Sequence, residues 1–102
     1  MIARMWRGWV RTEDRDAYVE YIERTGMAGY RQTPGNRGAH MLTRDLGDGR
    51  TEVVTLSFWD DEDVIRGFAG EEIGRAVFYP EDDRFLVDRE VTVTHFTVAS
   101  GG

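Results

Sequence analysis

The chain of 102 residues contains no cysteine and no lysine. Without cysteine it can form neither disulfides nor thiolate metal ligands, and it has no thiolate nucleophile. Without lysine it cannot form a Schiff base with a carbonyl substrate, because all thirteen basic residues are arginine. The absence of cysteine also suits a reducing compartment, so we expect a cytoplasmic protein.

Long apolar runs are absent as well. No run approaches the ~20 residues of a membrane-spanning helix, so no membrane contact is expected. Residues 1–7 lack the apolar core of a signal peptide. The net charge of −6 has the wrong sign for a nucleic-acid surface. A hydrophobic content of 40% instead predicts one folded domain, residues 1–98, with a short tail at 99–102.

The first half of the chain reads as a strand, a helix and a hairpin. β-compatible residues interleaved with arginines predict a strand over 2–10. Thr12 is expected to cap a helix with apolar residues at helical spacing, which Gly26 and Gly29 should end. The remaining predicted pieces are a loop at 33–36, a strand at 38–44, an Asp-Gly hairpin turn at 45–50 and a strand at 51–59.

The most informative stretch is 53–63, where a strand-like run ends on Trp59 and acidic residues follow at once. Acids suit the first turn of a helix, so we predict a helix over 61–69 with Asp60 as its N-cap. The remaining predicted pieces are a further helical piece around 71–78 that Pro80 stops, a solvated acidic turn at 81–84 and a long final strand over 85–98.

This order predicts an α+β, ferredoxin-like unit: strand, helix, strand, strand, helix, strand. Its four-stranded antiparallel sheet would carry both helices on one face. The other face would be bare, with apolar groups drawn from Met5, Trp9, Val53 and Val91. A bare apolar face on so small a chain predicts a homodimer with the two sheets face to face.

Candidate catalytic residues are few. His40 and His95 are the only histidines, so an imidazole base must be one of them. His95 shares the apolar face of the last strand with Val91 and Val93, which makes it the first choice for proton transfer. Tyr79, held in place by Pro80, is the second choice. Two separated histidines without cysteine make a weak metal signature, so no metal site is expected.

The aromatic residues could together form a flat apolar pocket for a small aromatic ligand. The candidates for this pocket are Trp6, Tyr30, His40, Trp59, Phe68 and Phe78. These residues could instead serve packing alone, as aromatic residues and lone histidines often do.

The chain resembles the dimeric α/β-barrel superfamily, and within it the antibiotic biosynthesis monooxygenase-like domains. The resemblance covers nearly the whole chain. It rests on the element order, on the strand-Trp-helix junction at 56–63 and on the aromatic segment at 76–83. It implies sheet-to-sheet dimers that form an α/β barrel, with a ligand cavity between sheet and helices in each subunit.

The haem-degrading branch of that superfamily can be compared position by position. The resemblance implies an Asn in the first strand, a Trp late in the helix after the junction and an iron-ligating His further on. This chain has Arg7 or Trp6, then Phe68, then Phe78. With Phe78 in place of a histidine ligand, we expect no cofactor.

Three functions are compatible with this sequence. The first is a cofactor-independent monooxygenase acting on an aromatic or quinol-like molecule, in which His95, Tyr79 or Arg7 helps a phenol or enol to ionise. The second is a haem-binding or haem-degrading protein with atypical ligands. The third is a non-catalytic, small-ligand-binding dimer module. This fold hosts unrelated activities, so it does not choose among them.

Overall fold

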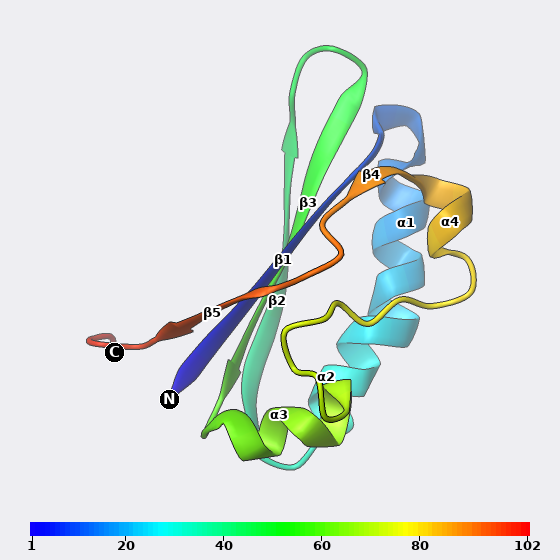
Figure 1. Ribbon diagram of the computed structural model, residues 1–102. Coiled ribbons are helices and arrows are strands. Elements are labelled where there is room, and N and C mark those ends of the chain that lie inside the picture. Colours follow the sequence, from blue (N-terminus) through cyan, green and yellow to red (C-terminus); the bar gives the residue numbers. More distant parts are fainter.

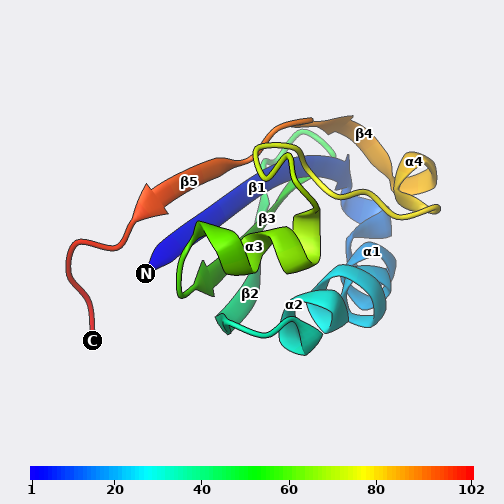
Figure 2. The same ribbon diagram turned by 60° about the horizontal axis from the view of Figure 1, so that its bottom comes forward.

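The computed structural model describes all 102 residues and consists of an antiparallel sheet covered on one face by helices (Figures 1 and 2). The predicted α+β, ferredoxin-like class is confirmed. The elements in chain order are β1 (Ile2–Arg11), η1 (Thr12–Asp14), α1 (Arg15–Ile22), η2 (Glu23–Met27), α2 (Ala28–Gln32), β2 (Asn36–Asp45), β3 (Arg50–Trp59), α3 (Glu62–Ala69), α4 (Asp82–Phe85), β4 (Leu86–Arg89) and β5 (Thr94–Thr97).

The sheet has the order β2-β3-β1-β4, and β5 pairs with β1 as well. The central pair, β1 and β3, is in register from Ile2 opposite Trp59 to Arg11 opposite Arg50. Strands β4 and β5 pair with different parts of β1, so that Gly8 faces Arg89 and Arg4 faces His95. Together β4 and β5 take the place of the single last strand expected from the sequence.

The final strand predicted over 85–98 is therefore interrupted, at residues 90–93. The backbone of this stretch bonds elsewhere: the Ala76 amide donates to the Val91 carbonyl at 3.0 Å, and the Val93 amide donates to the Gly74 carbonyl at 2.9 Å. These bonds tie the interruption to residues 70–81, here called the covering segment. The helical piece predicted around 71–78 is wrong for the same reason, since this segment contains neither helix nor strand (Figure 1).

The first helical region is longer than predicted. Thr12 does not cap it; the Thr12 hydroxyl instead lies 2.9 Å from the Thr51 hydroxyl. Gly26 and Gly29 do not end it either, because η2 is a π-helical turn that carries the helix through to Gln32. Gly29 serves packing: a methyl group there would lie 3.1 Å from both the Phe68 ring and the Tyr79 hydroxyl.

The second helix begins one residue later than predicted. The Asp61 carboxylate accepts a 3.0 Å hydrogen bond from the Val64 amide and is the N-cap. Asp60 instead pairs with Arg37 at 2.6 Å. The acidic turn predicted at 81–84 contains a short helix, α4, and its first residue, Asp82, is buried.

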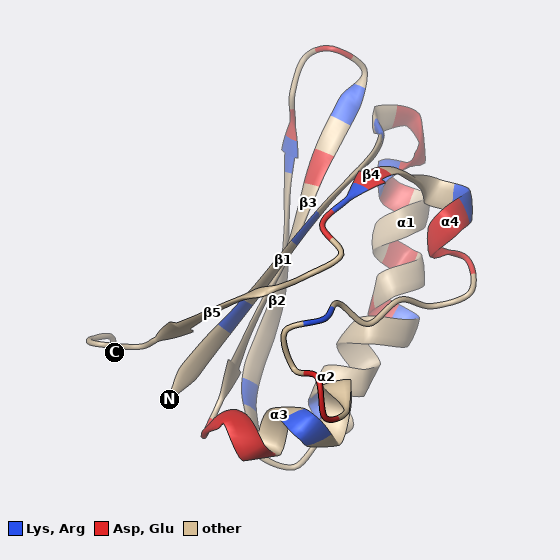
Figure 3. Cartoon of the chain, in the orientation of Figure 1, with Lys and Arg blue, Asp and Glu red and all other residues tan.

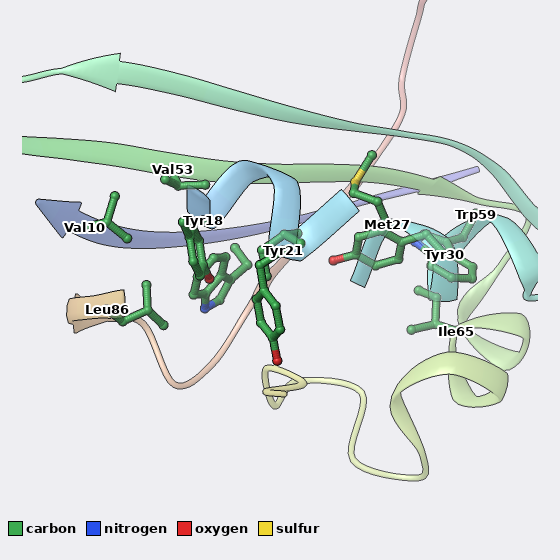
Figure 4. Packing of buried hydrophobic residues seen from close by; sticks show 11 residues of the cluster. Val10, Tyr18, Tyr21, Met27, Tyr30, Val53, Trp59, Ile65 and Leu86 are labelled. Atoms are coloured by element: carbon green, nitrogen blue, oxygen red, sulfur yellow. The ribbon is translucent and has the colours of Figure 1, made fainter. Parts of the chain in front are cut away.

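The core lies between the sheet and the helices, where eleven buried apolar residues form one cluster. Figure 4 shows Val10, Tyr18 and Leu86 toward one end and Tyr30, Trp59 and Ile65 toward the other. Val53, predicted on the bare face, is fully buried in this core because it alternates with Val54 along β3.

The opposite face of the sheet carries apolar side chains without any covering element. These are Met5, Trp9, Leu42, Val54, Leu56, Phe58 and Phe96, and we call them the open face. Val91, predicted here, lies in the interruption and is 64% exposed. Figure 3 shows that the middle parts of β2 and β3 carry no charge. None of the helices is long and apolar enough to cross a membrane.

Candidate active site

A cavity of about 30 Å³ lies between the sheet, the helices and the covering segment. This volume holds one or a few water molecules. Ten of its fourteen lining residues are hydrophobic. The lining consists of Arg4, Trp6, Tyr18, Ile22, Gly26, Tyr30, Thr55, Phe68, Ala76, Val77, Phe78, Tyr79, Asp82 and Val93.

Five of the residues predicted from the sequence meet in this cavity: Trp6, Tyr30, Phe68, Phe78 and Tyr79. The Tyr30 and Phe68 rings stack with their centroids 4.5 Å apart, and the Trp6 and Phe78 rings meet edge to face at 6.1 Å. The Trp6 indole N–H donates a 2.7 Å bond to the Glu90 carbonyl, which fixes the ring. The cavity is therefore walled by oriented aromatic faces.

Two residues predicted for the pocket lie outside it. Trp59 is fully buried behind Tyr30, and its indole N–H donates a 2.9 Å bond to the Ser57 hydroxyl. His40 is exposed and lies on the open face, because it pairs with Leu56 across the sheet and its ring is 6.5 Å from that of Phe58. His40 therefore does not line the cavity.

His95 lies at the edge of the cavity without lining it. Its Nε2 is 3.1 Å from the guanidinium of Arg4, which does line the cavity. A guanidinium can only donate, so Nε2 accepts and the proton of the neutral ring is on Nδ1. Burial lowers the pKa of His95, and the positive charge of Arg4 lowers it further. The imidazole is thus held in the neutral form, with its lone pair directed toward the cavity wall.

Tyr79 brings a free hydroxyl to the cavity. Its ring packs against Gly26 and Gly29 of the helical region, and no protein group forms a hydrogen bond with its hydroxyl. Its backbone amide donates a 2.7 Å bond to Asp82, which holds the residue in place. Burial raises the pKa of Tyr79, so the hydroxyl stays protonated near neutral pH and can donate to a ligand.

Arg4 also lines the cavity, although nothing in the sequence singled it out. It is only 2% exposed, and its guanidinium donates to the carbonyl groups of Ile73 and, at 3.0 Å, Arg75. Arg7, the arginine proposed from the sequence, points to the other face and pairs with Glu90 at 3.2 Å. The run Met5-Trp6 followed by Trp9-Val10 places apolar residues on both faces, so alternation alone could not assign the inner arginine.

Asp82 is the second residue missed. It is 2% exposed, lines the cavity and accepts a 2.9 Å bond from the Tyr18 hydroxyl. Burial raises the pKa of Tyr18, and the neighbouring Asp82 raises it further. Three consecutive acids read as a solvated turn, and nothing in the sequence marks which of them turns inward.

No family model and no curated protein matches the chain. Solved structures do match over nearly the whole length. They include a proposed antibiotic biosynthesis monooxygenase from Bacillus cereus (17% identity, TM-score 0.69, 99% of this chain and 95% of that one). A second antibiotic biosynthesis monooxygenase matches with 21% identity and a TM-score of 0.61, over 98% of this chain and 100% of that one.

A third match is a variant of MhuD crystallised with two manganese protoporphyrin IX molecules per active site (15% identity, TM-score 0.60, 100% of both chains). The chain therefore has the fold of the antibiotic biosynthesis monooxygenase-like domains, as the resemblance predicted. At these identities the likeness defines the fold and leaves the activity to the site.

The residues of the cavity do not fit a haem ligated through histidine. Phe78, which the resemblance sets in place of the haem ligand, lines the cavity with an apolar ring, and neither histidine is part of the lining. No three His, Asp or Glu side chains are grouped so that they could hold a metal ion.

Proposed function

We propose that the cavity is the active site of a cofactor-independent monooxygenase that oxidises an aromatic, quinol-like molecule. The observation that carries this proposal is an apolar, aromatic-walled cavity with a free hydroxyl, Tyr79, and a neutral imidazole, His95, at its edge. Such a reaction needs a dry cavity for substrate and dioxygen, and groups that help the substrate to ionise. The fold supports it, because two of the structural matches are described as antibiotic biosynthesis monooxygenases.

The chemistry balances without an external reductant. Loss of a proton from the substrate gives an electron-rich phenolate or enolate, which reduces dioxygen at a ring carbon. One oxygen atom stays in the product as a new carbonyl group. The other leaves as water together with the two hydrogens that the substrate loses, so the substrate supplies all the electrons.

In this proposal His95 accepts the substrate proton at Nε2 and Tyr79 donates a hydrogen bond to the oxygen that becomes negative. A base must be unprotonated before the reaction, and burial beside Arg4 keeps His95 so. A donor must be protonated, and burial keeps Tyr79 so. Nε2 is engaged by Arg4 in the ligand-free protein, so Arg4 has to turn away before His95 can accept a proton.

The cavity has to enlarge for such a substrate. Pockets for drug-sized ligands measure roughly 300–1,000 Å³, far above what is present. The covering segment is the part that can move, because it lacks regular structure and supplies Ala76, Val77, Phe78 and Tyr79 to the lining.

We also propose that the protein is a homodimer joined through the open face. Seven apolar side chains lie together there and no element of the chain covers them. An exposed apolar patch of this kind marks an interaction surface. Self-association of two identical faces also satisfies the symmetry of a closed dimer.

Oxygen uptake tests the proposed activity. Anthrones and hydroquinones are supplied to the purified protein, with and without added haem, and the spontaneous rate in buffer is subtracted. We expect uptake without haem and one labelled oxygen atom per product from ¹⁸O₂. His95→Gln should lower turnover by ~10²-fold or more. Arg31→Gln, which changes an exposed residue of α2 away from both the cavity and the open face, is the control.

Uptake that appears only with haem would overturn the proposal in favour of a haem protein. Full turnover in folded, dimeric His95→Gln and Tyr79→Phe variants would overturn the roles of these residues. Binding of the same aromatic molecules with no uptake would identify a ligand-binding module.

A further inference from the structure

Arg4 differs from every other arginine of the chain. Each of the other twelve lies within 4.0 Å of an Asp or Glu carboxylate, and their side chains are partly or largely exposed. Arg4 is the only buried arginine and the only one without a carboxylate partner. Nineteen acidic residues are present, so acids are not scarce.

A buried charge without a counter-charge is costly. The groups around Arg4 are all neutral: the carbonyl groups of Ile73 and Arg75, the imidazole of His95 and the Phe68 ring at 5.9 Å. The Tyr30 hydroxyl also lies beside it, but burial raises the pKa of Tyr30, so it is not a phenolate. The Asp82 carboxylate lines the same cavity and forms no ion pair with Arg4.

We propose that Arg4 is the binding site for a carboxylate on the aromatic ligand of this cavity. A guanidinium presents two parallel N–H donors that match the two oxygens of a carboxylate. In the ligand-free protein two carbonyl oxygens of the covering segment, those of Ile73 and Arg75, occupy these donors. These two carbonyl oxygens occupy the positions that we assign to the carboxylate oxygens of a bound ligand.

Ligand and covering segment therefore compete for one guanidinium. A carboxylate binds an arginine more strongly than a neutral carbonyl does. An aromatic acid that takes Arg4 thus removes two of the bonds that close the covering segment over the cavity. The same step creates the room that a ring system needs and frees Nε2 of His95. A neutral aromatic molecule lacks the group that can make this exchange.

This inference rests on the cavity that the proposed function uses, but not on oxygenation, so it is tested by binding alone. The probes are 2-naphthoate and 2-naphthamide, which share their ring and shape and differ in charge. Isothermal titration of the full chain near neutral pH should show naphthoate binding ~10- to 100-fold more tightly than naphthamide.

Arg4→Met should abolish that preference, so that both probes bind with similar affinity. Arg4→Lys keeps the positive charge but not the two parallel donors, so it should retain part of the preference. The matched control is Arg31→Met, which removes one positive charge from an exposed arginine paired with Glu23 at 2.6 Å. Arg31→Met should keep the native preference. Circular dichroism reports whether each variant is folded.

Equal binding of both probes by the native protein would overturn the inference, and this comparison needs no variant. A preference for naphthoate that survives in folded Arg4→Met would place the anion elsewhere and overturn it as well. Naphthoate preference in a protein without oxygen uptake would leave Arg4 assigned and reject only the proposed activity.

Discussion

The hydroxyl of Tyr18 donates a 2.9 Å hydrogen bond to the carboxylate of Asp82, and both side chains are buried. The second oxygen of Asp82 accepts a 2.7 Å bond from the Tyr79 amide. The pair thus joins α1 to the start of α4 and positions the last residues of the covering segment. Asp82 therefore links Tyr79 to Tyr18 of α1 through two hydrogen bonds, and this link holds Tyr79 at the cavity.

Tyr18→Phe should therefore destabilise the protein, by ~1.5–3 kcal/mol, because it removes a hydrogen bond to a buried charged group. Tyr21→Phe is the control: the Tyr21 hydroxyl only accepts a 3.0 Å bond from the half-buried Glu81 amide, and its loss should cost less. Urea denaturation of both variants measures the difference. If both variants lose the same free energy of unfolding, the Asp82 carboxylate does not depend on the Tyr18 hydroxyl, and the prediction is wrong.

Gly8 is required by the ring of Trp6. A methyl group at Gly8 would lie 2.5 Å from Cη2 of Trp6 and 3.0 Å from a methyl carbon of Leu86. The indole cannot swing aside without losing its bond to Glu90. We expect Gly8→Ala to cost ~1–3 kcal/mol, as overpacking of a core does. Gly74→Ala, which meets nothing within 4 Å, should leave the urea midpoint nearly unchanged.

The central strands and the Trp junction could be predicted from the sequence because each is determined locally. Strand β3 alternates regularly, and the Asp-Gly turn before it fixes its register with β2. The acids after Trp59 mark a helix start wherever the helix packs. Only the identity of the cap, Asp61 in place of Asp60, depends on the tertiary pairing of Asp60 with Arg37.

The covering segment could not be predicted, because its conformation depends on distant partners. Residues 74–76 bond to 91–93 and to Arg4, and none of these contacts is visible in a local pattern. The burial of Arg4 and Asp82 could not be predicted for the same reason, because it too depends on partners that are distant in the sequence. Aromatic residues of the cavity were predicted more easily, since a large ring is buried on almost any side of a small domain.

The open face should be the dimer interface. Leu56→Asp places a charge at its centre without touching the cavity, since Leu56 alternates with the inward Thr55. We expect the native protein to be a dimer by light scattering at micromolar concentration, and Leu56→Asp to be a folded monomer. Ala17→Asp, which adds the same charge at an exposed position on α1, should stay dimeric. A native monomer would contradict the prediction directly.

His95 should make stability depend on pH in a defined direction. Burial and Arg4 hold its folded-state pKa below the ordinary value of 6.5, so the unfolded chain binds a proton first as the pH falls. The free energy of unfolding should therefore be highest above pH 6.5, where His95 is neutral in both the folded and the unfolded chain. It should decrease as the pH falls through that value and level off below the folded-state pKa.

Urea denaturation between about pH 8 and pH 5 measures this dependence. The carboxyl groups whose pKa is lowered by arginines, such as Asp45 and Asp60, titrate below this window and do not interfere. His95→Gln keeps an acceptor for Arg4 but cannot be protonated, so its stability should change less over the window. His40→Gln removes the only other histidine and shows how much of the profile comes from the open face instead. Parallel profiles for His95→Gln and the native protein would show that His95 is not held neutral, and would remove it as the proton acceptor at this cavity.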